Sequence, residues 1–100
     1  MAHISVREDG EKTVLQLHQD LVASFVPEVK AELKKVVDQG HTVAVDLQDV
    51  SMVDSTGIGL LMAAHNSLQK SDHALEVLNA SEEVQKLFRT MRLDKRFHIV

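Results

Sequence analysis

Residues 42–47 form a short run, Thr-Val-Ala-Val-Asp-Leu, that is apolar at both odd and even positions. A strand with one face in water alternates apolar and polar residues, whereas a strand covered on both faces does not. We therefore predict a central strand here. Such a strand requires neighbours on both sides, and this requirement restricts the chain to folds built around a sheet.

The segments around this run alternate between strand and helix patterns. Strand patterns combine β-favouring residues with turn signals, and helix patterns repeat apolar residues every three or four positions. The predicted elements are a β-hairpin over residues 4–17 with an Asp9-Gly10 turn, a helix over 26–37, the central strand, a loop over 48–54, a helix to about residue 70, a strand over 74–78, a helix capped by Ser81 and a closing strand at 97–99.

The order of these elements indicates the fold class. Strands that alternate with helices of several turns are typical of β-α-β units on a mixed sheet. The class is therefore α/β or α+β. One hundred residues support one core, so residues 1–100 are predicted to form a single domain.

The composition excludes several classes of function. The formal net charge is −4, opposite in sign to that of proteins that neutralise phosphate backbones, and the three Phe residues offer little stacking surface, so we expect no nucleic acid partner. No stretch approaches the ~20 apolar residues of a membrane span, and residues 1–6 lack a secretory signal, so we expect no membrane partner. Cysteine is absent, which excludes disulfides and is compatible with the cytoplasmic location that we expect.

The histidines are the remaining candidates for metal binding. None of them forms the His-x-x-x-His or Glu-x-x-His spacing that places two ligands on one helical face. We expect no metal site, and we expect His65, which is in line with Ile58 and Met62, to be a packing residue. The six histidines are His3, His18, His41, His65, His73 and His98.

Ser55 lies in the segment that runs from the end of the central strand into the next helix, where sites gather in parallel sheets. Its position is that of an N-cap, so its hydroxyl is predicted to accept from the N–H of Gly57 or Ile58. An ordinary cap is the simplest interpretation. The alternative is a phosphorylation site, because a phosphate there meets unpaired N–H groups at the positive end of the helix.

Acidic neighbours support a switch by charge. Asp54 adjoins Ser55, and Asp46 and Asp49 lie on the same segment, so the ~1.5 to 2 negative charges of a phosphate increase the local repulsion. Thr56 is the substitute acceptor. We expect it to be less exposed than Ser55 because it lies one residue further into the helix.

Glycine and apolar residues in the same segment indicate contacts. Gly57 and Gly59 each cost about 1 kcal/mol relative to Ala in a helix, which favours close approach of another chain to their backbone. Val50, Met52 and Val53 are predicted to fill the core. For Met52 the alternative is a role in an adaptable binding surface.

Catalysis by Ser55 has little support. The hydrolase nucleophile elbow requires Gly-x-Ser-x-Gly, but Val53 stands two residues before Ser55. Residues 57–59, Gly-Ile-Gly, lack the Lys-Ser/Thr that ends a phosphate-binding loop. We therefore predict that the chain is not an enzyme.

Residues 46–59, Asp-Leu-Gln-Asp-Val-Ser-Met-Val-Asp-Ser-Thr-Gly-Ile-Gly, closely resemble the phosphorylation segment of the STAS family, in particular the single-domain anti-sigma factor antagonists of bacteria. The order of elements over nearly the whole chain is similar to that family as well. The resemblance implies a mixed sheet of four to five strands with an N-terminal β-hairpin, packed against three to four helices.

The resemblance also implies a partner-switching cycle in which Ser55 is phosphorylated by an anti-sigma factor serine kinase. The bare form binds that kinase, the phosphorylated form is released, and a metal-dependent serine phosphatase resets the cycle. ATP and Mg²⁺ then belong to the kinase, so this chain, which we expect to be a monomer that forms heterocomplexes, has no cofactor of its own. The expected partner-binding residues are Asp20, Gln48, Asp49, Ser51, Met52, Asp54, Thr56, Gly57, Ile58 and Gly59.

One departure from the family pattern keeps an alternative open. Many members carry a Gly-Glu-Leu-Asp-like turn after the second strand, whereas residues 19–22 here are Gln-Asp-Leu-Val, so Val22 takes the place of the acid. Asp20 is the nearest substitute. The alternative is a ligand-binding or scaffolding STAS domain of another signalling assembly.

Overall fold

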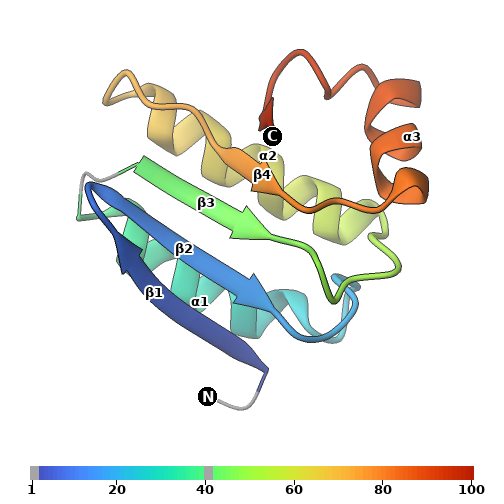
Figure 1. Cartoon of the computed structure of the whole chain (residues 1–100), viewed down its shortest axis with the longest axis horizontal. Helices are drawn as coiled ribbons and strands as arrows, with labels where there is room; N and C mark the ends of the chain where they lie inside the picture. Colours follow the sequence, from blue (N-terminus) through green and yellow to red (C-terminus); the bar gives the residue numbers. More distant parts are fainter. Residues whose placement is uncertain (1–2, 40–41) are drawn as a thin grey trace.

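The chain folds into a mixed sheet whose strands are connected by helices (Figure 1). The computed structural model describes residues 3–39 and 42–100. In this part of the chain the elements are, in order, β1 (Ile4–Asp9), β2 (Lys12–Leu17), α1 (Val26–Val37), β3 (Thr42–Asp46), α2 (Ser55–Gln69), β4 (Glu76–Leu78), α3 (Glu82–Thr90) and β5 (His98–Ile99). The predicted alternation of strands and helices is confirmed.

The N-terminal hairpin forms as predicted. β1 pairs antiparallel with β2, with Ile4 opposite Leu17 and Asp9 opposite Lys12. Gly10 in the turn has a φ of +68°, a left-handed conformation that a residue without a Cβ adopts freely. The Asp-Gly pair therefore marks the turn correctly.

The described residues contain five strands in the spatial order β1-β2-β3-β4-β5. Strands β2 to β5 run parallel to one another, and β1 is antiparallel to β2. The apolar run thus forms the central strand, β3, as predicted. Because β2, β3 and β4 point the same way, the segments that follow them emerge at one edge of the sheet, on the right in Figure 1.

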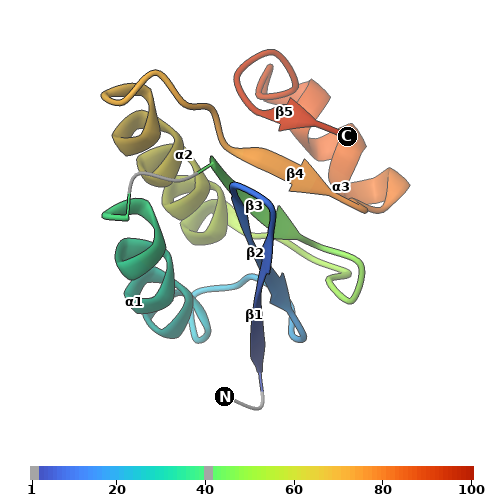
Figure 2. The ribbon, with the colours of Figure 1, turned by 60° about the vertical axis from the view of Figure 1, so that its left-hand side comes forward.

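Helices α1 and α2 lie side by side on one face of the sheet, and α3 lies at the β4–β5 edge (Figure 2). None of the helices in the described ranges is long and apolar enough to cross a bilayer. The core lies between α1, α2 and the sheet. Its fully buried members include Leu15, Leu17, Val29, Val43, Val45, Leu61 and Leu68.

The two faces of β3 are covered differently. Val43 and Val45 point into the core beneath the helices, whereas Ala44 belongs to the opposite face. Ala44 is nonetheless fully buried, and on its face the side chains of Lys12 and Glu76, from the two flanking strands, form an ion pair with an Nζ–Oε1 distance of 2.7 Å. Both faces are therefore closed as predicted, one by helices and the other by side chains of neighbouring strands.

His65 is a packing residue, as expected, and only 3% of its surface is exposed. Its Nδ1 accepts from the N–H of Leu75 at 3.3 Å, and its ring packs edge-on against Phe97. Burial, with a smaller contribution from the positive charge of Arg96, lowers the pKa of His65. The ring is therefore held in its neutral form within the core.

Candidate functional site

The N-cap of α2 is Asp54 and not Ser55. Asp54 has an extended backbone (φ −93°, ψ −177°), and its Oδ1 accepts from the N–H of Gly57 at 2.8 Å. The prediction that Ser55 caps the helix is therefore wrong. Aspartate and serine are about equally good caps, so the local sequence does not choose between them. Asp54 gains a second bond, because its Oδ2 accepts from the N–H of Ala23 at 2.9 Å.

Ser55 is consequently the first residue of α2, and it is exposed. Its hydroxyl is free of the capping role, because Asp54 already fills it. The expectation that Thr56 is the less accessible of the two stays a prediction, because Thr56 is exposed as well. The reason is that the first turn of α2 rests on the core through Gly57 and Ile58, which leaves both preceding residues on the outer side.

The charge of Asp54 is stabilised by the backbone around it. The hydrogen bond from the Gly57 N–H is the main cause that lowers the pKa of Asp54, and the N–H groups of Ala23, Thr56 and Asp54 act in the same direction. Desolvation opposes them without reversing the shift. A fixed negative charge therefore lies next to Ser55 over the physiological pH range.

The connection from β2 to α1 holds the loop that precedes α2. Asp20 Oδ1 accepts from the N–H groups of Ser51 and Met52, at 2.7 and 3.2 Å. Leu21 continues the pairing: its N–H donates to the Met52 carbonyl, and it forms a parallel bridge with Val53. The carboxylate of Asp20 therefore positions the loop through contacts within the chain. The sequence predicted Asp20 only as a partner-binding residue.

Gly57 is required by a contact within the chain. A Cβ at this position would lie 2.4 Å from the carbonyl oxygen of Leu21 and 3.0 Å from Cγ1 of Val53. The hypothesis that another chain approaches Gly57 is therefore wrong, because Leu21 occupies that space. Gly59 differs, since it is exposed and a Cβ there meets nothing within 4 Å.

The apolar residues of the segment divide between core and surface. Val50 and Val53 are buried and fill the core, as predicted. Ile58 is 6% exposed, so its side chain is part of the core, and its predicted role in partner binding stays a prediction. Met52, by contrast, is 57% exposed.

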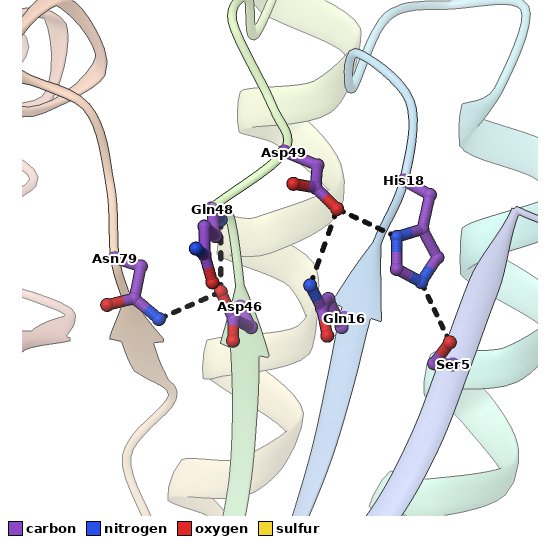
Figure 3. Close-up of polar contacts among 7 residues, drawn as sticks. All are labelled: Ser5, Gln16, His18, Asp46, Gln48, Asp49 and Asn79. Atoms are coloured by element: carbon purple, nitrogen blue, oxygen red, sulfur yellow. Dashed lines mark hydrogen bonds and ion pairs between the residues drawn. The ribbon is translucent and has the colours of Figure 1, made fainter.

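A row of polar contacts orders the edge of the sheet from which the loop emerges (Figure 3). Asp46, at the end of β3, accepts from the Gln48 N–H at 3.0 Å and from the Asn79 side chain at 3.1 Å. Asp49 lies 2.8 Å from His18 Nδ1. These bonds tie the start of the loop to the segments that follow β4 and β2.

The same row extends from His18 to the edge strand. The Oγ of Ser5 on β1 lies 2.7 Å from His18 Nε2, and Gln16 Nε2 donates to the Asp49 carboxylate at 3.4 Å (Figure 3). Sequence analysis did not select His18, Gln16 or Asn79 for this site. Their positions at the carboxyl ends of parallel strands were the available signal.

Comparison with known proteins agrees with this geometry. A family model described as "Mlab, STAS domain" matches residues 4–100. The chain belongs to the STAS family. An anti-sigma-B factor antagonist of Staphylococcus epidermidis is 36% identical to this STAS domain over 75 residues, which cover 74% of the chain and 69% of the relative.

Solved structures with this fold extend the comparison. An anti-sigma-factor antagonist (STAS) domain protein from Planctomyces limnophilus has a TM-score of 0.88 at 18% identity, covering 96% of this chain and 87% of that protein. The phosphorylated form of SpoIIAA, a Bacillus cell fate determinant, has a TM-score of 0.74 at 22% identity, covering 97% and 90%. The predicted STAS-like sheet with its hairpin and helices is therefore confirmed.

The STAS domain brings most of the predicted site residues to one edge of the sheet, with different degrees of access. Asp20 and Asp54 are partly exposed and make internal bonds, and Gly57 and Ile58 are buried. The exposed members are Gln48, Asp49, Ser51, Met52, Ser55, Thr56 and Gly59. These are the members of the predicted partner-binding set that are open to solvent, and their contact with a partner stays a prediction.

Metal ligands do not gather at this edge. Within residues 3–39 and 42–100, no three His, Asp or Glu side chains are placed to hold an ion together. His41 lies outside the described residues.

Proposed function

We propose that this STAS domain is an anti-sigma factor antagonist that works as a partner switch. The unphosphorylated form binds an anti-sigma factor with serine kinase activity, phosphorylation of Ser55 releases that partner, and a metal-dependent serine phosphatase restores the bare hydroxyl. The single observation that carries the proposal is the exposed Ser55 at the start of α2, with the capping bond made by Asp54.

The position of Ser55 suits a reversible charge. At the first residue of a helix, a phosphate meets the positive end of the helix dipole, which reduces its cost to the fold. The same phosphate lies beside the ionised Asp54, so the surface gains negative charge where a partner would contact it. The domain is therefore expected to remain folded while the partner is repelled.

The chemistry of the switch belongs to the partners. The chain supplies the acceptor hydroxyl, and the kinase supplies ATP and Mg²⁺, so we propose no cofactor and no catalytic residue for this chain. The relative named as an anti-sigma-B factor antagonist, at 36% identity, supports the partner class.

The direct test is phosphate transfer. The purified protein is incubated with the anti-sigma factor kinase of the same genome, Mg²⁺ and ATP, and its intact mass is measured. We expect an increase of one phosphate in the wild type and none in Ser55→Ala. Ser71→Ala is the matched control, because Ser71 is an exposed serine just after the other end of α2, outside the predicted partner-binding residues, and should leave the increase intact.

Binding measurements complete the test. Ser55→Ala should retain the kinase, whereas Ser55→Asp should bind it at least about tenfold more weakly, which corresponds to about 1.4 kcal/mol. Undiminished phosphate incorporation in Ser55→Ala would refute the site, and normal binding by Ser55→Asp would refute release by charge.

A ligand-binding STAS domain is the second candidate, and a groove between α1 and α2 favours it. The groove has a volume of about 330 Å³, and its lining includes the apolar Leu33 and Leu60 and the basic Lys30 and Lys34. Ala63→Trp, which fills this groove, separates the two functions. Phosphorylation of Ser55 should stay unchanged in this variant in either case. The signalling output in cells stays intact if the switch is the function, and it is lost if the groove is the site.

A further inference from the structure

Ser5, His18 and Asp49 form a continuous row of hydrogen bonds, which Figure 3 shows. The Oγ of Ser5 lies 2.7 Å from His18 Nε2, and His18 Nδ1 lies 2.8 Å from Asp49 Oδ2. The three residues come from β1, from the end of β2 and from the loop after β3, so they meet only in the folded sheet. A hydroxyl, an imidazole and a carboxylate in this order can activate a serine as a nucleophile.

The carboxylate of Asp49 determines which nitrogen of His18 carries the hydrogen. A carboxylate only accepts hydrogen bonds, so Nδ1 must be the donor. In the neutral ring Nε2 is then an acceptor, and the Ser5 hydroxyl donates to it. Gln16 Nε2 also donates to Asp49 Oδ2, at 3.4 Å, and this second bond holds the carboxylate in place. His18 is therefore oriented with its basic nitrogen toward Ser5.

The histidine bond distinguishes Ser5 from the other serines. A serine hydroxyl alone is a weak nucleophile, and an adjacent base activates it by taking its proton. Among the hydrogen bonds of residues 3–39 and 42–100, only that of Ser5 joins a serine hydroxyl to a histidine, whereas the Ser81 hydroxyl caps α3. Ser5 is exposed, and the side chains of His18 and Asp49 are 31% and 47% exposed, so a reagent can reach the row.

The backbone next to Ser5 offers a hydrogen-bond donor. The His18 N–H donates to the His3 carbonyl, so this pair and the pair of Ser5 with Gln16 are the hydrogen-bonded pairs of the hairpin. Val6 belongs to the alternate pairs, and its N–H therefore points away from β2 toward the outer edge of β1. The N–H that follows the nucleophile is a donor to the oxyanion in known acyl-transfer sites.

We propose that Ser5 is an acyl acceptor, a modification site that takes an acyl group from an activated ester or thioester. The Oγ of Ser5 attacks the carbonyl carbon, and its proton passes to Nε2 of His18. The C–O or C–S bond to the leaving group breaks, and the departing alkoxide or thiolate takes the proton from Nε2. The products are a Ser5 ester and a free alcohol or thiol. This single transfer involves no turnover and does not depend on the switch at Ser55.

The surroundings of Ser5 fit a neutral acyl group. Charges of both signs lie nearby, because Arg7 follows two residues later on the same face of β1 and Asp49 lies beyond His18. This mixture gives no net attraction to an anionic donor, whereas an acyl carbonyl is neutral until the attack. Among the described strands β1 is the edge of the sheet, and Val6 is 48% exposed, so a donor can approach from outside (Figure 1).

The experiment measures the reactivity of Ser5 in the full chain with two probes. A fluorophosphonate labels nucleophilic serines with loss of fluoride, and p-nitrophenyl acetate donates an acetyl group. The chain contains no Tyr, which removes one competing hydroxyl. Mass mapping of peptides locates each label. Ser5→Ala removes the acceptor, His18→Gln removes the base, and Ser71→Ala is the matched control at an exposed serine. Circular dichroism checks that each variant is folded.

We expect both probes to label Ser5 in the wild type and in Ser71→Ala, and to leave this position unlabelled in Ser5→Ala. Labelling in His18→Gln should be slower by about 100-fold, the lower end of the range for a general base. Asp49→Asn should slow it by about tenfold, and Asp49→Glu, which keeps the carboxylate, should restore most of the rate. If Ser5→Ala does not fold, His18→Gln decides the test. The proposal is overturned by an unlabelled Ser5 in the wild type, by an undiminished rate in His18→Gln, or by equal labelling of Ser5 and Ser71.

Discussion

Two helices of this STAS domain begin next to a serine, and the two serines have opposite roles. Ser81 caps α3, since its hydroxyl accepts from the N–H of Val84 at 3.1 Å. Ser55 stands one position further along α2, and Asp54 makes the cap in its place. In this domain Ser81 is therefore structural, whereas the hydroxyl of Ser55 is left out of the cap by the acid that precedes it.

The anchoring of the two helices differs as well. The cap of α3 connects residues of a single turn, from Ser81 to Val84. The cap of α2 also reaches Ala23 in the β2–α1 connection, and Gly57 lies against Leu21 of the same connection. The start of α2 is therefore fixed by tertiary contacts, and the start of α3 is fixed mainly by local ones.

The largest effect should come from closing the space at Gly57. In Gly57→Ala, the new Cβ meets the Leu21 carbonyl at 2.4 Å, so we expect the free energy of unfolding to fall by about 3 kcal/mol, as in an overpacked core. Urea denaturation followed by circular dichroism measures it. Gly59→Ala is the matched control and should raise stability by up to about 1 kcal/mol, because its Cβ meets nothing. A loss in Gly59→Ala equal to that in Gly57→Ala would contradict the packing argument.

Removal of the two caps should show the difference in anchoring. Ser81→Ala should cost about 1 kcal/mol, a typical value for a helix cap. Asp54→Ala should cost more, because it frees the N–H groups of both Gly57 and Ala23. Thermal unfolding of the two variants side by side measures the order. A smaller loss in Asp54→Ala than in Ser81→Ala would mean that the bond to Ala23 contributes nothing.

Acid should weaken the cap of α2 and leave the cap of α3 unchanged. The pKa of Asp54 is lowered from its ordinary value of 3.8 in the folded state, so the unfolded chain takes up the proton first as the pH falls. The stability that Asp54 contributes is therefore complete above pH 3.8 and is lost as the pH falls through the lowered value. The difference in unfolding free energy between wild type and Asp54→Asn should shrink over this window. Ser81→Ala should show a difference that does not depend on pH.

The smallest change in stability is expected at the proposed acceptor itself. Ser55→Ala removes a hydroxyl that makes no cap, so the free energy of unfolding should change by less than about 0.5 kcal/mol. Chemical denaturation beside Ser81→Ala measures the contrast. A loss in Ser55→Ala as large as that in Ser81→Ala would show that Ser55 has a structural role after all.

The fold was predictable from local patterns. The doubly apolar run of β3, the Asp9-Gly10 turn and the serine cap of α3 each depend on a few neighbouring residues, and each is found where the pattern places it. The Asp-Ser-Thr-Gly motif likewise indicated the segment of interest. The burial of individual residues inside that segment was predicted less accurately, because it depends on which other parts of the chain pack against the segment.

The details that sequence analysis missed all involve distant pairs. The choice of Asp54 over Ser55 as cap depends on Ala23, and the requirement for Gly57 depends on Leu21. The contact between His18 and Asp49 likewise depends on the parallel register of β2 and β3. Local propensity carries no information about such pairs, which become visible only when the strands are set side by side.

The close approach of Gly57 to Leu21 has a consequence for recognition. Since Gly57 packs against Leu21 without space for a Cβ, and Asp54 is bonded to Ala23, we expect the residues that precede Gly57 to keep one arrangement before any partner arrives. A preorganised surface loses little conformational entropy when a complex forms. Association should then resemble the docking of a rigid body, and its reversal would come from altered charge without any rearrangement of the backbone.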